Sequence, residues 1–262
     1  KIEIGCCYMK SIHEKRTVRI IIPMAGAGSR FASAGYDKPK PFIDVLGKPM
    51  IFHVLENLHV SNSEYILLVR SEHLNKEKVV IDEIVSQFNV TIVPVDSLTE
   101  GAACTVLHAH KLINDCQPIL IANSDQIVDI NVQDFIHDSD ARDLDGSILC
   151  FEDTDAKWSY AKLDETGLVT LVKEKEVISS HATVGLYYFR YGKIFVENAI
   201  DMIVRNERVN KEFYVAPVYN YAIKNGSKIG IYSIDKISMH GTGTPADLNA
   251  YIEFASQQKD GK

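Results

Sequence analysis

The stretch that decides the fold of this chain is Ile20-Ile21-Ile22-Pro23-Met24-Ala25-Gly26-Ala27-Gly28-Ser29-Arg30. A short aliphatic run changes abruptly into a turn of small residues that ends in an arginine. Glycine lets main-chain N–H groups approach a bound anion closely, and the planar guanidinium of Arg30 can contact two phosphate oxygens at once. The pattern predicts a buried strand over 18–23, followed by a phosphate-binding loop.

Positively charged side chains follow this loop closely. The next segments are Lys38-Pro39-Lys40-Pro41 and Gly47-Lys48-Pro49-Met50, and the first of them supplies two flexible ammonium groups. The loop is not of the Walker type, because no Gly-Lys-Ser/Thr follows it at the right spacing. It also lacks the third glycine of the dinucleotide fingerprint. The combination of glycines, arginine and lysines, rather than the glycines alone, therefore indicates a site for a nucleoside triphosphate.

Composition and charge limit the function classes. The chain has 262 residues, of which 46% are hydrophobic and 24% charged, which is typical of a globular protein of one large α/β domain, with or without a small appendage. The formal net charge of −7 argues against a nucleic-acid partner, whose binding surface would be basic. We find no apolar run of about 18 residues and no secretory signal, so we expect no membrane partner and a cytoplasmic location.

The five cysteines are Cys6, Cys7, Cys104, Cys116 and Cys150. Their number is odd and their spacing fits no metal motif. The last three lie in apolar surroundings, and we expect them to be reduced packing residues of a cytosolic protein. Residues 1–17 show mixed polarity without a clear period, so they are predicted to be a leader that is poorly structured or peripheral to the fold.

In the first half of the chain, strand and helix patterns alternate. The order of wholly apolar strands and helices predicts a parallel sheet that is covered on both faces. The predicted strands are 18–23, 65–69, 90–95 and 118–122, and the predicted helices are 49–58, 71–88, 100–113 and 132–137.

The second half contains a hairpin signature and no linker or repeat. Asp164-Glu165-Thr166-Gly167 lies between the strand patterns 160–163 and 168–172, with glycine at the end of the turn. We expect one mixed α/β domain over 18–262, in which 18–137 binds the nucleotide and 138–262 covers the ligand groove and binds an acceptor. The other predicted strands are 146–151, 183–189 and 229–234, and the helices are 194–204, 213–225 and 245–257, the last with Thr244 as N-cap.

A carboxylate is expected beside the phosphate-binding loop. Ligands of open α/β sheets bind beyond the carboxyl ends of the strands, and the strand 118–122 runs into Asn123-Ser124-Asp125. A carboxylate next to phosphates requires a cation between them, and Mg²⁺ suits such a place because it takes few protein oxygens and completes its shell with water and phosphate. Asp125 is therefore the candidate metal ligand, and the alternative is that it only caps a turn.

Taken together, the Gly-x-Gly-x-Arg turn, the Lys-Pro-Lys-Pro segment and the Gly-Lys-Pro-Met segment resemble the signature of the sugar-phosphate nucleotidylyltransferases, or nucleoside-diphosphate-sugar pyrophosphorylases. The resemblance implies a three-layer α/β/α nucleotide-binding fold with a mixed, mainly parallel central sheet. It also implies that an NTP reacts with a sugar-1-phosphate or another phosphate monoester, with release of pyrophosphate. Arg30, Lys40 and Asp125 would be catalytic, Asp125 would hold Mg²⁺, and the nucleotide would contact Ala25, Gly26, Ala27, Gly28, Ser29, Arg30 and Gly101.

The acceptor site is also implied by this resemblance. Glu174-Lys175-Glu176 is similar to a Glu-Lys-Pro of the family, and Gly185-Leu186-Tyr187-Tyr188-Phe189 is similar to its Gly-x-Tyr-x-Phe strand. On this basis Lys175 would hold the acceptor phosphate, Glu174 would touch the rest of the acceptor, and Gly185 would line its site. Glu176 replaces the family's proline.

One departure concerns the metal. Gly241-Thr242-Gly243-Thr244-Pro245 resembles a family segment that begins with aspartate, a second metal ligand, and Gly241 stands in its place. The metal is then expected to keep Asp125, water and phosphates, or to gain His240 or Asp235.

Other departures concern specificity. Cys104 stands where thymidylyl- and uridylyl-transferring members often have glutamine, so the base stays open. Tyr160 replaces a common glycine, and 213–217 replaces an acidic Glu-x-Thr-Asp pattern. Tyr160, Trp158 and Tyr214 are candidates to shape the acceptor pocket, and the alternative, which is the commoner explanation for each, is a buried core aromatic.

Two other function classes stay open. A nucleotide-sugar-dependent glycosyltransferase of the related fold would often use an Asp-x-Asp motif, whereas Asn123-Ser124-Asp125 has one acid. A non-catalytic nucleotide-binding module is favoured by Gly241. Self-association into a homo-oligomer is left open as well.

Overall fold

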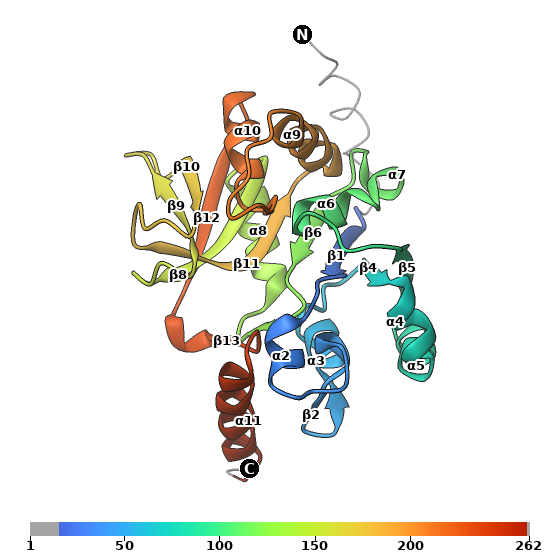
Figure 1. Ribbon diagram of the computed structural model, residues 1–262. Helices are drawn as coiled ribbons and strands as arrows, with labels where there is room; N and C mark the ends of the chain where they lie inside the picture. The colour runs from blue at the N-terminus through green and yellow to red at the C-terminus, as the bar shows by residue number, and fades with distance from the viewer. Residues whose placement is uncertain (1–15, 261–262) are drawn as a thin grey trace.

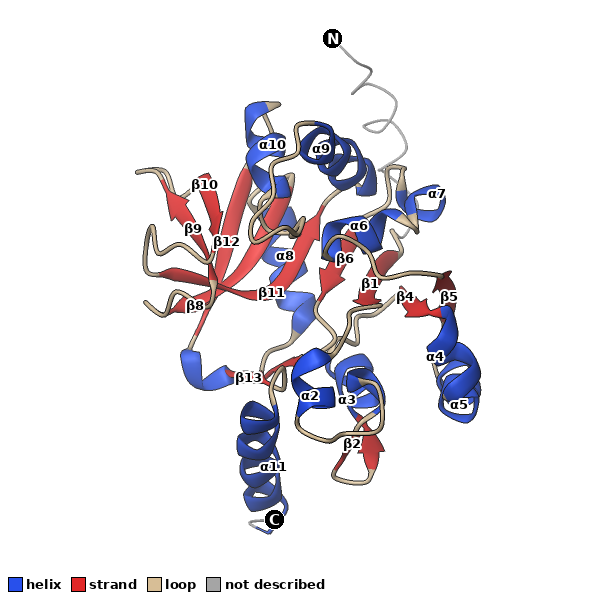
Figure 2. Cartoon of the chain, viewed as in Figure 1, coloured by secondary structure: helices blue, strands red, loops and turns tan. Residues whose placement is uncertain are grey.

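The computed structural model describes residues 16–260, and a nine-stranded mixed sheet with helices on both faces forms its centre (Figure 1, Figure 2). The strand order is β10-β9-β11-β6-β1-β4-β5, and β8 joins β11 to β12 beside this path. The predicted fold class is confirmed. The strands are β1 (Val18–Met24), β4 (Ser63–Arg70), β5 (Val90–Val95), β6 (Ile119–Ala122), β8 (Gly146–Glu152), β9 (Ser159–Leu163), β10 (Val169–Glu174), β11 (His181–Phe189) and β12 (Ile229–Ile234).

The helices are distributed along the whole described chain. They are α2 (Ser29–Ser33), α3 (Met50–Asn57), α4 (Ser71–Lys76), α5 (Lys78–Gln87), α6 (Ala102–Leu107), α7 (His110–Ile113), α8 (Val132–Ala141), α9 (Gly192–Val204), α10 (Val218–Lys224) and α11 (Pro245–Asp260). Two small sheets pair β2 (Asp44–Val45) with β3 (Lys48–Pro49), and β7 (Gln126–Val128) with β13 (Met239–Gly241).

Strand direction changes between the two halves of the chain. β1 runs parallel to both β4 and β6, and β4 runs parallel to β5. β11 is antiparallel to its neighbours β6, β8 and β9. The parallel sheet expected from the apolar strands of the first half is therefore present as β5, β4, β1 and β6, and β8 and β12 form a further parallel pair in the second half. Because β11 pairs directly with β6, one continuous sheet carries residues of both halves to a common edge.

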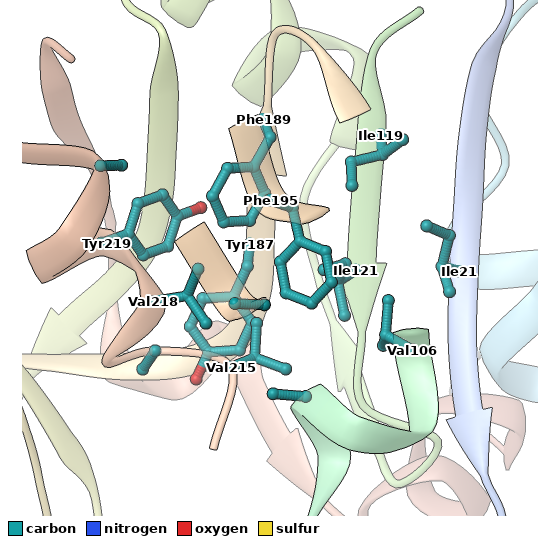
Figure 3. Packing of buried hydrophobic residues seen from close by; sticks show 14 of the residues in the cluster. Ile21, Val106, Ile119, Ile121, Tyr187, Phe189, Phe195, Val215, Val218 and Tyr219 are labelled. Atoms are coloured by element: carbon teal, nitrogen blue, oxygen red, sulfur yellow. The ribbon is translucent and has the colours of Figure 1, made fainter. Parts of the chain in front are cut away.

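Alternation along the strands builds the three layers. Successive side chains of a strand point to opposite faces. Ile21 of β1 packs in a cluster with Val106 of α6 and Phe195 of α9 (Figure 3). Its neighbours Ile20 and Ile22 belong to a second cluster on the other face, which includes buried side chains of α3, α5 and α8. All three isoleucines are fully buried, so the aliphatic run before the glycine loop lies at the centre of the core.

Three predicted helices differ from the observed ones. The helix expected over 71–88 is broken at Glu77, whose φ of −110° and ψ of 30° are not helical. The helix expected over 100–113 is divided into α6 and α7. The helix expected over 213–225 begins only at Val218, because the main chain of Phe213 instead bonds to Glu100 and Ala103 across 2.7 and 3.0 Å. The hairpin β9–β10 and the Thr244 cap of α11 are confirmed.

The cysteines follow the expectation in part. Cys104 and Cys150 are free, but Cys116 is disulfide-bonded, so the expectation that it is a reduced packing residue is wrong. It lies half-buried in the loop before β6 rather than in the sealed core. The leader predicted over 1–17 lies outside the described residues up to position 15. None of the helices within 16–260 is long and apolar enough to cross a membrane.

Tyr219 connects α10 to the sheet and provides a test of this packing. The side chain is fully buried, and its hydroxyl donates to the carbonyls of Ser147 at 3.1 Å and Tyr188 at 2.9 Å. We expect Tyr219→Phe to lower the free energy of unfolding by about 1–2 kcal/mol, because buried carbonyls lose a donor. Urea denaturation measures this, with an unchanged m-value. A variant as stable as the parent would contradict the packing.

Candidate active site

The two segments expected to form a site meet at the carboxyl edge of β1 and β6. These strands are parallel neighbours, so the loops that follow them leave from the same edge. Asp125 follows β6, and its Oδ2 lies 2.6 Å from Nζ of Lys40, which belongs to the short 3₁₀ turn Lys40–Phe42. Each of the two side chains is 21% exposed. The contact joins the segment after the glycine loop to the predicted metal ligand.

The glycine loop lies against Lys40. Gly28 has a φ of +61°, and a Cβ on it would lie 3.8 Å from the backbone nitrogen and the Cβ of Lys40. Ala25 is buried beneath the loop, whereas Ser29 and Arg30 are exposed at the start of α2. Lys38 lines neither of the two clefts described here. The loop forms one wall of a small cleft of about 270 Å³, whose lining includes Gly26, Ala27, Gly28, Ser29, Arg30, Lys40, Ser124, Glu212 and Gly243.

The segment before α11 closes over Asp125. The N–H of Thr242 donates to the carbonyl of Asp125 at 2.8 Å. A Cβ on Gly243 would come within 2.9 Å of Asp125 Oδ2, and Nη1 of Arg30 lies 3.5 Å from the carbonyl of Gly243. A segment more than a hundred residues away thus completes the surroundings of the carboxylate, and its position follows from the pairing of β13 with β7.

The donor set around Asp125 fits a magnesium ion bound together with phosphates. A Cβ on Gly241 would meet no atom within 4 Å, so the place of the family's second aspartate is open. His240 is 2.8 Å from Asp129 Oδ2 and stacks on Phe254, so it is engaged elsewhere. Within residues 16–260 no group of three or more His, Cys, Asp or Glu side chains could hold a metal. A single carboxylate suits Mg²⁺, which completes its shell with water and substrate oxygens.

A second, larger cleft of about 880 Å³ continues from the small one. Arg30, Lys40, Ser124 and Glu212 line both, so the clefts join beside Lys40, whose partner Asp125 lines the larger one. The larger cleft also contains Glu174, Lys175 and Gly185, the three residues expected to bind an acceptor.

Lys175 is held in a defined place in the larger cleft. Its backbone has a φ of +55°, and its N–H donates to the carbonyl of Trp158 at 3.0 Å. Its ammonium group donates to the hydroxyl of Tyr214 at 2.8 Å and lies 4.8 Å from the centre of that ring. The sequence did not predict this aromatic partner for Lys175.

At the end of β10, the carboxyl group of Glu174 accepts a hydrogen bond from the hydroxyl of Ser159, the first residue of β9. Burial raises the pKa of the Glu174 carboxyl, while the hydrogen bond from Ser159 and the charge of Lys175 act in the opposite direction. Burial is the main cause that raises the pKa of Tyr214, and a hydrogen bond to Glu212 raises it further. The lining of the larger cleft therefore includes the half-buried carboxyl group of Glu174 and the hydroxyl groups of Ser159 and Tyr214.

The structure favours the core alternative for Tyr160, and it places Gly101 outside both clefts. Tyr160 does not shape a pocket, because it is fully buried and its hydroxyl donates to the carbonyl of Asp155 at 2.8 Å; Trp158 and Tyr214 do line the larger cleft. Gly101 lines neither cleft, although Ala102 lines the larger one. The φ of Gly101 is +117°, and a Cβ there would lie 2.5 Å from the carbonyl oxygen of Phe213.

Several cleft residues carried no signal in the sequence. Glu212 lines both clefts, and the rim of the larger one holds an ion pair of 2.8 Å between Lys236 and Asp153. Burial disfavours the ionised form of Asp153, but the bond from Lys236 and two backbone amides outweigh it and lower its pKa to about 2. Asn123 and Gln126 also line the cleft, and their position beside Asp125 was the one clue available.

Gly185 provides a test of the cleft floor. Its φ is +105°, and a Cβ there would lie 2.3 Å from both Asn123 Nδ2 and Gln126 Oε1. Gly167 is a matched control, since its φ is +80° but a Cβ would meet no atom within 4 Å. We expect Gly185→Ala to lower the free energy of unfolding by at least about 1 kcal/mol more than Gly167→Ala, because strain is joined by a clash. Equal losses in urea denaturation would contradict the observed crowding.

Comparison with known proteins agrees with this geometry. A family profile described as "Nucleotidyl transferase" matches residues 19–233. The nucleoside-diphosphate-sugar pyrophosphorylase from Vibrio cholerae RC9 is 25% identical, with a TM-score of 0.76 over 89% of this chain and 99% of that one.

Two curated relatives are longer than this chain. The Bifunctional protein GlmU of Campylobacter fetus is 25% identical over 86% of this chain and 50% of its own length. The mannose-1-phosphate guanylyltransferase catalytic subunit beta of Drosophila pseudoobscura is 25% identical over 65% of this chain and 47% of its own length. The chain thus spans about half the length of these relatives. Because the family profile covers most of the sequence and the clefts meet at its signature residues, the chain belongs to the nucleotidyl transferase family.

Proposed function

We propose that this protein transfers the nucleotidyl group of an NTP to a phosphate monoester, of which a sugar-1-phosphate is the expected type, and releases pyrophosphate. The observation that carries the proposal is the 2.6 Å contact between Lys40 and Asp125 at the junction of two clefts. The smaller cleft, with its glycine loop, suits the triphosphate, and the larger one suits the acceptor. The two ligands would then meet at the ion pair.

The reaction requires positioning and charge neutralisation. An oxygen of the acceptor phosphate attacks the α-phosphorus in line, the bond to the β-phosphate oxygen breaks, and pyrophosphate leaves, without a covalent enzyme intermediate. Two anions must be held together while charge develops on five-coordinate phosphorus. In this proposal Arg30 binds the leaving pyrophosphate, Lys40 contacts the α-phosphate, and Lys175 contacts the acceptor phosphate. All three line the larger cleft.

The proposal assigns the metal to Asp125. Mg²⁺, when bound, would neutralise negative charge on the phosphates. Lys40 would release the carboxylate as its ammonium group turns to the nucleotide, and Gly243 keeps the space beside Asp125 Oδ2 free, because a Cβ there would lie 2.9 Å away.

The two rival function classes have less support. A glycosyltransferase would not need Arg30 and Lys40 for a leaving pyrophosphate, and Asn123-Ser124-Asp125 offers one carboxylate. A non-catalytic module would not need an acceptor cleft that continues from the nucleotide cleft, with Lys175 held in it. Membership of the nucleotidyl transferase family supports catalysis.

Pyrophosphate release tests the proposal directly. The protein is incubated with Mg²⁺, each common NTP in turn, and either glucose-1-phosphate or mannose-1-phosphate. We expect Arg30→Ala, Lys40→Met and Asp125→Asn each to lower turnover about a hundredfold or more, because the first two remove a positive charge that faces the phosphates and the third removes the charge of the proposed metal ligand. Lys78→Met is the control, since it breaks an exposed ion pair with Asp82 on α5.

Circular dichroism and thermal unfolding establish that the variants fold. The control is expected to retain full turnover. The assignment of roles is wrong if the three site variants keep near-parental rates, and the proposed function is wrong if the parent releases no pyrophosphate with any pair of substrates.

A further inference from the structure

We propose that Tyr214 is a positioning residue for the transfer reaction, and that its hydroxyl group and its ring together hold the ammonium group of Lys175 at the place where the acceptor phosphate binds. The inference rests on the proposed function, which assigns the acceptor phosphate to Lys175. It adds a role for Tyr214 that no sequence motif implies. Both side chains line the larger cleft.

The ammonium group of Lys175 needs such a partner, because the backbone alone does not set its position. The backbone itself is fixed, with a φ of +55° and a hydrogen bond of 3.0 Å from its N–H to the carbonyl of Trp158. The ammonium group, however, lies at the end of a flexible stem of four carbons, and holding such a stem in one conformation is entropically unfavourable. A partner that holds it before the acceptor arrives therefore favours binding.

Tyr214 makes two contacts with this ammonium group. Its hydroxyl accepts a hydrogen bond from Nζ of Lys175 at 2.8 Å, and its ring centre lies 4.8 Å from the same atom. An ammonium group has three donors, so two of them stay available for phosphate oxygens. Because burial raises the pKa of Tyr214, the hydroxyl group is neutral at neutral pH. Tyr214 thus holds the ammonium group without cancelling the positive charge that the phosphate requires.

Glu212 orients the hydroxyl group of Tyr214 for this task. The hydroxyl has one proton to donate and can also accept. Its hydrogen bond with Glu212 uses the proton, because a carboxylate can only accept. The oxygen lone pairs are then left for Lys175. Glu212 lines both clefts, so this chain of hydrogen bonds begins where the clefts join and ends at the lysine of the acceptor site.

The main chain beside Tyr214 is anchored in the core. The preceding residue, Phe213, is buried, and its N–H and carbonyl bond to Glu100 at 2.7 Å and to Ala103 at 3.0 Å. The guanidinium group of Arg208 lies 4.4 Å from the centre of the Phe213 ring and 3.0 Å from the carboxylate of Glu100. Tyr214 therefore extends from a fixed backbone and can restrain the ammonium group rather than move with it.

Steady-state kinetics of pyrophosphate release tests the inference. NTP and Mg²⁺ are kept saturating, and the acceptor is the phosphate monoester that the parent uses best. Tyr214→Phe keeps the ring and removes the hydroxyl. We expect it to raise the KM for the acceptor about tenfold, because a hydrogen bond to a charged group is lost, with kcat changed less than about threefold and the KM for NTP less than about twofold. Tyr214→Leu also removes the ring and should raise the acceptor KM about threefold further.

A double-mutant cycle separates positioning of Lys175 from any other role of Tyr214. Lys175→Met removes the ammonium group and should lower kcat/KM for the acceptor about a hundredfold. Because Tyr214 is proposed to act through Lys175, adding Tyr214→Phe to that variant should change kcat/KM less than about twofold. Tyr221→Phe is the matched control, since the ammonium group of Lys224 lies 4.8 Å from the Tyr221 ring centre but Tyr221 lines neither cleft. We expect both KM values of this control to equal those of the parent.

Thermal unfolding establishes that each variant folds. The inference is overturned, while the proposed function stands, if Tyr214→Phe leaves the acceptor KM unchanged or if its loss falls on kcat or on the KM for NTP. The same holds if Tyr214→Phe causes an equal loss with and without the ammonium group of Lys175, because Tyr214 would then act independently of it. Absence of pyrophosphate with every pair of substrates would instead overturn the proposed function, and the inference with it.

Discussion

The ion pair between Lys40 and Asp125 is the interaction on which the rest of the site depends. The two residues are 85 positions apart and meet at 2.6 Å because β1 and β6 are parallel neighbours whose carboxyl ends share an edge. A half-buried charge without a partner would be costly, so each residue stabilises the other while no ligand is bound. The close approach of Gly28 to Lys40 and of Gly243 to Asp125 keeps bulky side chains away from the pair.

Much of the fold could be predicted because its signals are local. Apolar runs predicted the strands of the first half. The turn residues Asp164–Gly167 predicted the hairpin, and Thr244 predicted the start of a helix. The meeting of the glycine loop with Asp125 could also be predicted, because the rule that ligands bind beyond the carboxyl ends of strands requires only the strand order. What these residues do chemically rests on the resemblance to a family and stays a prediction that kinetics must test.

The remaining features depend on contacts between distant segments. The main chain of Phe213 bonds to Glu100 and Ala103, and this pairing removes the residues before Val218 from the expected helix. Tyr160 is a core residue because the β9 strand turns it inward. No sequence motif marked Gln126 as a cleft residue. Its surroundings are formed by Gly185 of β11 and by the pairing of β7 with β13, which are both distant in the sequence. Local propensity carries no information about such pairings.

The central claim is that a triphosphate is clamped between the glycine loop with Lys40 on one side and a magnesium ion on Asp125 on the other. The most direct measurement is a crystal structure of the protein with Mg²⁺ and an NTP analogue that cannot be cleaved between the α- and β-phosphates. The account predicts that the phosphates lie against residues 26–30, with the metal bound to the Asp125 carboxylate. A nucleotide bound outside the small cleft, or phosphates there with the metal held by other residues, would contradict it.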